Sequence, residues 1–337
     1  MNTFASTYYD KNVAQWIDLF NSDTWRESTA QWIDSACEAY GIKRTAPPQF
    51  APAQLHQIQA SVKTDAADLI FTANAPGLAA EPAITVTAGQ FLPDRVVVPL
   101  AVDRSAGYML SPDFGHSLAD LGDSVEHWEM AMASLGSFQV ALMGHEDEFF
   151  DSGVTVVDPQ FLPEQFEQAL MMHVSLPPEH PLHIDGAHAD HLAGHIDELS
   201  RACSILHDGP VPLSLEHGNF DLSQVVVPGQ AGEHGRILNL SSAHWAHPFS
   251  SLNVALQAMT EAWDCDTNDE RIMQVLFSYL DQFAAYGTAD ELYELIDPAC
   301  LVAPLSQHET WLRLLLDADD DKLREYAPAV LGTLDLA

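Results

Sequence analysis

The chain has 337 residues, of which 47% are hydrophobic and 9% aromatic, and this length is enough for two domains or two lobes with sizeable cores. Lys and Arg number 13 against 49 Asp and Glu, which gives a formal net charge of −36. So acidic a surface repels nucleic-acid phosphates and anionic lipids, which argues against both as partners. It suits a cationic ligand or a basic protein surface, or it only keeps the protein soluble in a host whose proteins are acidic throughout.

Nothing in the composition suggests export or membrane insertion. The sequence has no run of about 18 apolar residues that could span a bilayer. Its first residues, MNTFASTYYDKNVAQWIDLF, lack the basic start and apolar block of a secretory signal. The four cysteines lie far apart without a C-x-x-C pair, and we expect them to be reduced and mostly buried: Cys37, Cys203, Cys265 and Cys300. These features predict a cytoplasmic protein.

Two tryptophan-centred helical patterns open the chain, VAQWIDLF and STAQWIDSACEAYG. The second has plausible N-caps at Asp23 or Ser28 and ends at Gly41. Both contain the letters AQWID, which is too short a match to indicate a repeat architecture. The faces that carry Trp16 and Trp32 are therefore expected to be core contacts.

Short β-like segments follow between Pro47 and about Leu110. They are LHQIQASV, ADLIFTAN, RVVVPLAVD and GYMLSP. A helix from Glu81 to Phe91 interrupts them, so this region is expected to form a small mixed sheet with one helix against it.

Beyond SPDFGHSLADL the pattern becomes mainly helical, over Val125–Leu142, Pro163–Met172 and Ala187–Leu206. A β-rich loop region from Leu213 to Leu240 precedes further helices, which run from Ser251 to the end. The sequence thus predicts an α+β, two-lobed fold of the protein-kinase type. Residues 1–113 would form the N-terminal helices and a small β-rich lobe, and residues 114–337 a larger helical lobe.

The segment LSLEHGNFDLSQVVV, residues 213–227, resembles the catalytic loop H-G-D-x-H-x-x-N of the aminoglycoside phosphotransferases and related small-molecule kinases. GRILNLSSAHWAHPFSSL is similar to the family's second metal-binding segment, and LIFTANAPGLAAEPAIT to the strand and helix that carry its phosphate-binding Lys and the Glu partner of that Lys. RVVVPLAVDRSAGYMLSPDFGHSLADL looks like the last small-lobe strands and the link between the lobes. The resemblance covers roughly Trp25 to the C-terminal helices.

The resemblance implies a set of site positions, and most of them are substituted. The base position holds Asn219, which cannot accept a proton, and the metal positions hold Gln224 and Asn239. The phosphate-binding Lys position is Thr72, followed by Ala73 and Asn74. The residues that match the family are His217 and Gly218 of the loop and Glu81, the partner of the Lys.

Phosphoryl transfer depends on a cation that holds the phosphates, on Mg²⁺ ligands and on a base. Losing one such part typically reduces the rate by roughly 10²–10⁴, and hard Mg²⁺ generally requires at least one carboxylate. The leading interpretation is therefore a pseudokinase without an expected cofactor, which binds an unknown small molecule or protein in or near the inter-lobe cleft.

Two alternatives remain open. Asp221 lies two residues after Asn219 and could serve as a displaced base or metal ligand in an active kinase, which would use Mg-ATP on a small hydroxylated and possibly cationic metabolite. In the segment GAHADHLAGHIDEL, His188, His191 and His195 are spaced i, i+3 and i+7 and therefore fall on one helical face. With Asp185 or Asp190 nearby they could bind Zn²⁺, although a solvated stripe of histidines is the commoner case.

Overall fold

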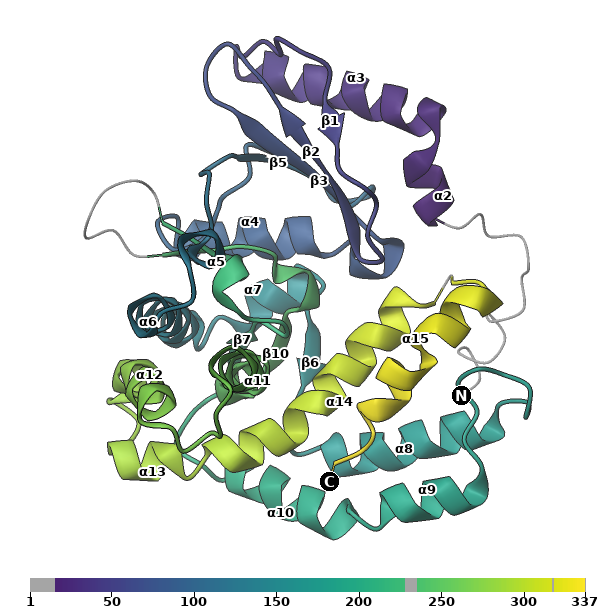
Figure 1. Cartoon of the computed structure of the whole chain (residues 1–337), viewed down its shortest axis with the longest axis vertical. Coiled ribbons are helices and arrows are strands. Elements are labelled where there is room, and N and C mark those ends of the chain that lie inside the picture. Colours follow the sequence, from purple (N-terminus) through teal and green to yellow (C-terminus); the bar gives the residue numbers. More distant parts are fainter. Residues whose placement is uncertain (1–15, 228–234, 317, 337) are drawn as a thin grey trace.

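The small lobe is built on a five-stranded antiparallel sheet with the strand order β1-β2-β3-β5-β4. Figure 1 places this lobe above the larger helical lobe. The computed structural model describes residues 16–227, 235–316 and 318–336. The strands of the sheet are β1 (Gln49–Phe50), β2 (Gln57–Val62), β3 (Leu69–Asn74), β4 (Ala101–Asp103) and β5 (Tyr108–Pro112).

Alternation along β3 gives the small sheet two different faces. Phe71 and Ala73 are completely buried in an aromatic core beneath α3 (Asp23–Ala39), where the Trp32 and Phe71 rings lie 5.8 Å apart. Thr72 and Asn74 point to the opposite face. Because α2 (Trp16–Asn21) and α3 cover only the first face, the polar β3 residues are directed towards α4 and the large lobe (Figure 1).

Helix α4 (Glu81–Phe91) lies between the small sheet and the large lobe. A short 3-10 helix, η1 (Pro76–Leu78), leads from β3 into it, and Pro82 occupies its first turn, where a missing N–H does no harm. The buried side chains of Ile84 and Ala88 belong to the hydrophobic core of the large lobe. This helix therefore fixes Glu81 at the junction of the two lobes.

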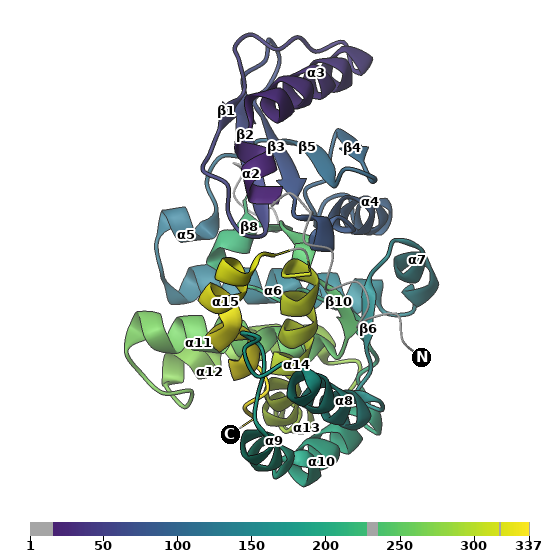
Figure 2. The same cartoon turned by 90° about the vertical axis from the view of Figure 1, so that its right-hand side faces the viewer.

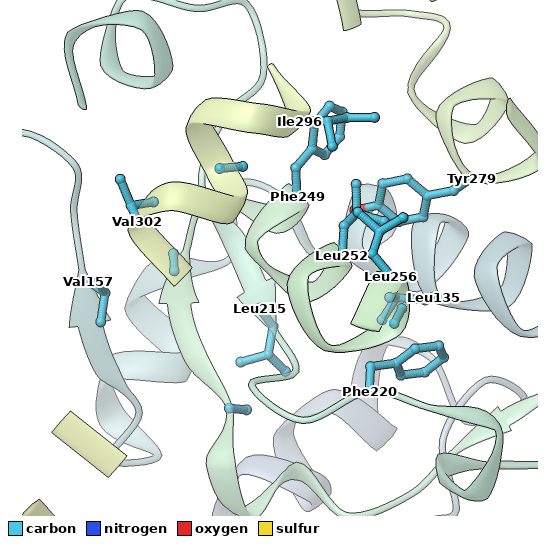
Figure 3. Packing of buried hydrophobic residues seen from close by; sticks show 14 of the residues in the cluster. Leu135, Val157, Leu215, Phe220, Phe249, Leu252, Leu256, Tyr279, Ile296 and Val302 are labelled. Atoms are coloured by element: carbon cyan, nitrogen blue, oxygen red, sulfur yellow. The ribbon is translucent and has the colours of Figure 1, made fainter. Parts of the chain in front are cut away.

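The large lobe consists of helices packed around one extensive apolar core. Figure 3 shows Leu135 of α6, Tyr279 of α12 and Val302 of α14 among the side chains that fill it. The helices are α5 (Leu118–Leu121), α6 (Val125–Leu142), α7 (Glu146–Asp151), α8 (Leu162–Ser175), α9 (Gly186–Ala193), α10 (Ile196–His207), α11 (Leu252–Trp263), α12 (Glu270–Leu280), α13 (Ala289–Tyr293), α14 (Ile296–Leu314) and α15 (Asp320–Gly332).

The large lobe also contains two small sheets and several short 3-10 helices. Strand β10 pairs in parallel with β6 and antiparallel with β7, and β8 pairs antiparallel with β9. The elements are β6 (Thr155–Val157), β7 (Ser214–Glu216), η2 (Leu222–Gln224), β8 (Val225–Val226), β9 (Arg236–Ile237), η3 (Leu240–Ser242), β10 (His244–Ala246), η4 (Pro248–Ser251) and η5 (Asp281–Phe283).

Helix α14 connects the two lobes. Both Figure 1 and Figure 2 show it running from the large lobe up to the small lobe. Its first turns, from Ile296 to Val302, are buried in the large lobe, whereas Leu314 near its end joins the core of the small lobe. At that end Gly77 packs so closely that an added Cβ would lie 1.9 Å from the carbonyl oxygen of Arg313. The small lobe is therefore seated on the end of this helix.

The two-lobed α+β prediction is confirmed, but several expected elements differ. The helix expected over residues 187–206 is broken, because α9 ends at Ala193 and Gly194 forms its C-cap. The N-cap of α3 is Ser22, whose hydroxyl accepts a hydrogen bond from the Trp25 N–H, and not Asp23 or Ser28. Residues 95–97 pair with Ile237 of β9 instead of extending β4.

Strands β6 and β10 were not expected at all, because each has only three residues. The parts of the opening helical pattern before residue 16 lie outside the described residues. Among the helices that are described, none is long and apolar enough to cross a bilayer.

Candidate active site between the lobes

The loop that resembles the family's catalytic loop begins directly after β7 and is anchored by a buried carboxyl group. Glu216 is 2% exposed, and its Oε1 accepts hydrogen bonds from the Gly218 N–H at 2.7 Å and from the Ser251 hydroxyl at 2.9 Å. Burial raises the pKa of Glu216, an effect that nearby His244 and these two donors oppose. The carboxyl group therefore fixes the start of the loop to the N-terminal end of α11.

Gly218 is required by this arrangement. Its φ of +78° lies in the left-handed region, and an added Cβ would lie 2.1 Å from the carbonyl oxygen of Ser242. The loop is thus pressed against η3, which follows Asn239 directly.

His217 ties the same loop to the strand before Asn239. Its Nε2 lies 2.8 Å from the carbonyl oxygen of Leu238, so this nitrogen carries the proton and donates it. Burial lowers the pKa of His217 to about 4, so the ring is neutral at pH 7. The imidazole acts as a structural tie between the loop and the segment that precedes Asn239.

Asn219 and Asp221 lie beyond these anchors. Asn219 is exposed. Asp221 is the N-cap of η2, and its Oδ1 accepts hydrogen bonds from the backbone N–H and the hydroxyl of Ser223. One oxygen of the candidate substitute base is therefore already used in a local turn, as is common for Asp in loops.

Gln224 and Asn239 stand on either side of the β8–β9 hairpin. The backbone carbonyl of Gln224 accepts a hydrogen bond from the Leu238 N–H at 2.9 Å, while its side-chain amide donates to Ser223. Asn239 adopts the left-handed conformation with φ 55° and accepts a hydrogen bond from the Ser241 hydroxyl at 2.7 Å. Its amide oxygen is a neutral ligand where a carboxylate would serve Mg²⁺ better.

Glu81 reaches the same segment from the small lobe. It is 2% exposed, and burial raises its pKa to about 7, an effect that hydrogen bonds from the Asn74 side chain and the Leu240 N–H only partly offset. The side chain on β3 that meets Glu81 is thus Asn74. Thr72, which the resemblance placed at the Lys position, lies two residues earlier on the same face of the strand.

The contacts bring the site segments together around Asn239. Its preceding neighbour, Leu238, bonds to His217 and Gln224, and its following neighbour, Leu240, donates to Glu81. The segments that resemble the family's catalytic loop and second metal-binding segment therefore meet the Glu81 helix at the lobe junction. The residues present there are amides, a neutral imidazole and carboxyl groups.

The histidine stripe does not form as the sequence suggested. His188 and His191 are on α9, but His195 lies after the break and is the N-cap of α10. The rings of His191 and His195 are 5.9 Å apart. In the described part of the chain, no group of three or more His, Cys, Asp or Glu residues is placed to hold a metal ion.

Sequence reasoning missed three residues that shape the site: Glu216, Ser251 and the role of Asn74. The acidic residue directly before His-Gly was a visible signal, because Glu216 is the last residue of a buried strand, β7. Ser251 gave no such signal, since it reaches the loop from 35 residues away.

No protein-family model matches the sequence, and no curated protein does. Solved structures do match. The ethanolamine kinase of Plasmodium vivax is similar over 99% of this chain and 95% of its own, with a TM-score of 0.62 and 12% identity. The macrolide 2'-phosphotransferase MphH of Brachybacterium faecium has a TM-score of 0.58 at 15% identity, over 90% of this chain and 98% of its own.

Choline kinase LicA of Streptococcus pneumoniae has a TM-score of 0.56 at 10% identity, covering 91% of this chain and 99% of its own. At such identities the likeness concerns the fold. The chain therefore has the two-lobed, protein-kinase-like fold that antibiotic phosphotransferases share with choline and ethanolamine kinases.

Proposed function

We propose that this protein is a catalytically impaired member of the phosphotransferase fold, a pseudokinase that binds a small molecule or a protein partner at or near the lobe junction. The surroundings of Glu81 carry the proposal. In a working kinase this carboxylate pairs with the Lys that holds the phosphates. Here its hydrogen-bond partners are the Asn74 amide and a backbone N–H, and its pKa is raised to about 7.

The other working parts agree with this interpretation. Asn219 cannot take the proton of an attacking hydroxyl, and Gln224 and Asn239 supply only neutral oxygens. Each replacement weakens charge stabilisation of the transferring phosphoryl group. Because base, metal and cation act as a unit, their joint loss removes most of the acceleration, although the separate losses do not add.

The firmly anchored loop favours a binding role over a decayed remnant. Glu216, His217 and Gly218 still fix the loop against η3 by short hydrogen bonds and close packing. A loop held in this way presents Asn219 and Asp221 in a defined geometry to a ligand. The strongly negative net charge favours a cationic ligand or a basic protein surface.

The competing function is an active kinase that uses Asp221 as its base. An assay with Mg-ATP and a panel of hydroxylated amines distinguishes the two. We expect no phosphorylated product above background from the wild-type protein. A reproducible product that disappears in Asp221→Ala, but persists in a control variant of an exposed carboxylate, Asp147→Ala, would overturn the pseudokinase proposal.

A further inference from the structure

A buried carboxyl group and a buried imidazole face each other at the start of the loop after β7. Glu216 and His244, which are 2% and 0% exposed, lie directly opposite each other where β7 pairs with β10. Oε2 of Glu216 is 3.9 Å from Nδ1 of His244, too far for a hydrogen bond. In the described part of the chain neither atom has a hydrogen-bond partner. Folded proteins rarely leave two such atoms unbonded side by side.

The other ring nitrogen of His244 is bound by α14. Its Nε2 lies 3.0 Å from Oε2 of Glu309, whereas the Thr310 hydroxyl and Nη2 of Arg313 are farther away, both at 3.3 Å. Burial acts to raise the pKa of Glu309, but the hydrogen bond to His244 and the charge of Arg313 outweigh it and lower that pKa. Glu309 is therefore an ionised acceptor, so Nε2 of His244 carries a proton and donates it.

The protonation of Nε2 explains the gap on the other side of the ring. A neutral His244 with its proton on Nε2 presents a bare lone pair at Nδ1, and an ionised Glu216 presents lone pairs at Oε2. Two acceptors that face each other repel. Burial raises the pKa of Glu216, so this carboxyl group readily takes up a proton. One proton between the two atoms, on either of them, would replace the repulsion by a hydrogen bond of about 2.8 Å.

The other groups around the pair do not supply this proton. Burial and the charge of Glu216 raise the pKa of Tyr279 on α12 well above its ordinary value, so the phenol stays neutral. On β6 the partner of His244 is Thr155, which does not titrate. On α14, Glu309 and Arg313 form an ion pair with each other at 2.9 Å. The proton must therefore come from the solvent.

We propose that Glu216 and His244 form a proton-operated latch between the loop that carries Asn219 and helix α14. Uptake of one proton closes the 3.9 Å gap and joins Glu216 to Glu309 through the His244 ring. Because Glu216 and His244 compete for the same proton, the titration belongs to the pair. The latch does not depend on the proposed function, since it involves no ligand.

Closing the latch would connect the loop to the seat of the small lobe. Oε1 of Glu216 already holds the Gly218 N–H at 2.7 Å. At the other end, Glu309 is paired with Arg313, whose backbone carbonyl lies against Gly77 of the small lobe. A low pH should therefore stiffen the loop, and a high pH should loosen it.

Native-state hydrogen exchange of the Gly218 amide tests the latch in the full-length protein at pH 6 and pH 8.5. Rates are expressed as protection factors, which remove the intrinsic effect of pH on exchange. We expect protection about tenfold higher at pH 6, because the closed latch adds one hydrogen bond to the group that holds this amide. His244→Gln, which cannot titrate, should lose the rise. The control His188→Gln, at an exposed position on α9, should keep it.

Crystals grown at the same two pH values give a second readout that requires no variant. We expect the distance from Nδ1 of His244 to Oε2 of Glu216 to be about 2.8 Å at pH 6 and near 3.9 Å at pH 8.5. Equal protection of the wild type at both pH values would overturn the proposal. So would a rise that persists in His244→Gln or disappears in His188→Gln, or the same distance in both crystals.

Discussion

At the scale of single residues, the lobe junction is controlled by groups that are buried and constrained. Gly218 permits the loop after β7 to approach η3 closely. Glu216 holds the start of this loop through the Gly218 N–H, and His217 holds it through the Leu238 carbonyl. Glu81 stands opposite, with its pKa raised to about 7 by burial. These residues set the geometry of the loop that carries Asn219 and of the segment that carries Asn239.

Gly218→Ala should strongly destabilise the protein, because it combines a left-handed backbone with a collision at 2.1 Å. We expect a loss of about 3 kcal/mol in the free energy of unfolding, measured by urea denaturation. Gly115 is the matched control, since it has φ +82° and open space around its Cβ. Gly115→Ala should lose only the backbone part, about 1 kcal/mol. Equal losses in the two variants would contradict the close packing against Ser242.

The carboxyl group of Glu81 predicts an unusual pH dependence. Its folded-state pKa of about 7 exceeds the usual value of 4.5, so the folded state binds more protons between these pH values. Stability from this group is therefore present below pH 4.5 and is lost as the pH rises through 7. Glu81→Gln should therefore gain up to about 3 kcal/mol relative to wild type between pH 5 and pH 8. A constant difference across that range would contradict the raised pKa.

At the scale of elements, long periodic helices were predictable and short or interrupted elements were not. The apolar spacing of α4 and α6 gave their limits correctly, at Glu81–Phe91 and Val125–Leu142. Strands β6 and β10 have three residues each, too few for a period, and they form only because they pair with each other and with β7. Gly194 is the C-cap of α9, so the helix predicted over residues 187–206 ends there.

The sequence predicted the parts of the candidate site that a motif marks, but not the tertiary contacts that hold them. Its loop and its Glu81 helix were identified from their resemblance to motifs of the phosphotransferase family. The pairing of Glu81 with Asn74 instead of Thr72 depends on where β3 ends relative to α4, which local sequence does not reveal. The anchoring of Glu216 by Ser251 is likewise a tertiary contact.

The packing of α8, α14 and α15 contains a buried histidine pair that should make these helices sensitive to acid. His173 and His308 face each other with their Nε2 atoms 3.3 Å apart, and Nδ1 of His308 lies 2.9 Å from the Thr333 hydroxyl. Burial lowers the pKa of both rings, that of His308 to about 4. The stability they contribute is therefore present above pH 6.5 and is lost as the pH falls towards 4.

We expect the free energy of unfolding to fall between pH 7 and pH 5, and less steeply in His308→Phe than in the wild type. The slope per pH unit, from urea denaturation, is the measurement. The exposed His188 on α9 is the control, and His188→Gln should keep the wild-type slope. The same slope in all three proteins would show that the pair is not buried in its neutral form.

At the scale of the whole molecule, α14 joins the two lobes into one unit. Its start is buried in the large core and its end in the small core, where η1 rests on the carbonyl of Arg313. The lobe junction therefore has a rigid support on the side of α14, and Glu81 is held over η3 by packing on both faces of α4.

Gly77→Ala tests that support, because its Cβ would lie 1.9 Å from the Arg313 oxygen. We expect a loss of about 3 kcal/mol, with a lower Tm for the whole protein. Gly186→Ala is the control, since no atom lies within 4 Å of the added Cβ and Ala is the better helix former. An unchanged Tm in Gly77→Ala would show that the lobes are not seated on α14 in this way.

The central claim is that the fold of a phosphotransferase persists here without a working Mg-ATP site, and calorimetric titration with Mg-ATP tests it most directly. The wild-type protein is compared with a variant that carries Asn74→Lys, Asn219→Asp, Gln224→Asn and Asn239→Asp, and with a second in which Thr72→Lys replaces Asn74→Lys.

The changes add one cation for the phosphates and two carboxylates for base and metal. We predict no binding to the wild type at millimolar nucleotide and Mg²⁺-dependent binding to the Asn74→Lys combination, since that Lys would meet Glu81. Tight, Mg²⁺-dependent binding of ATP by the wild type would contradict the account.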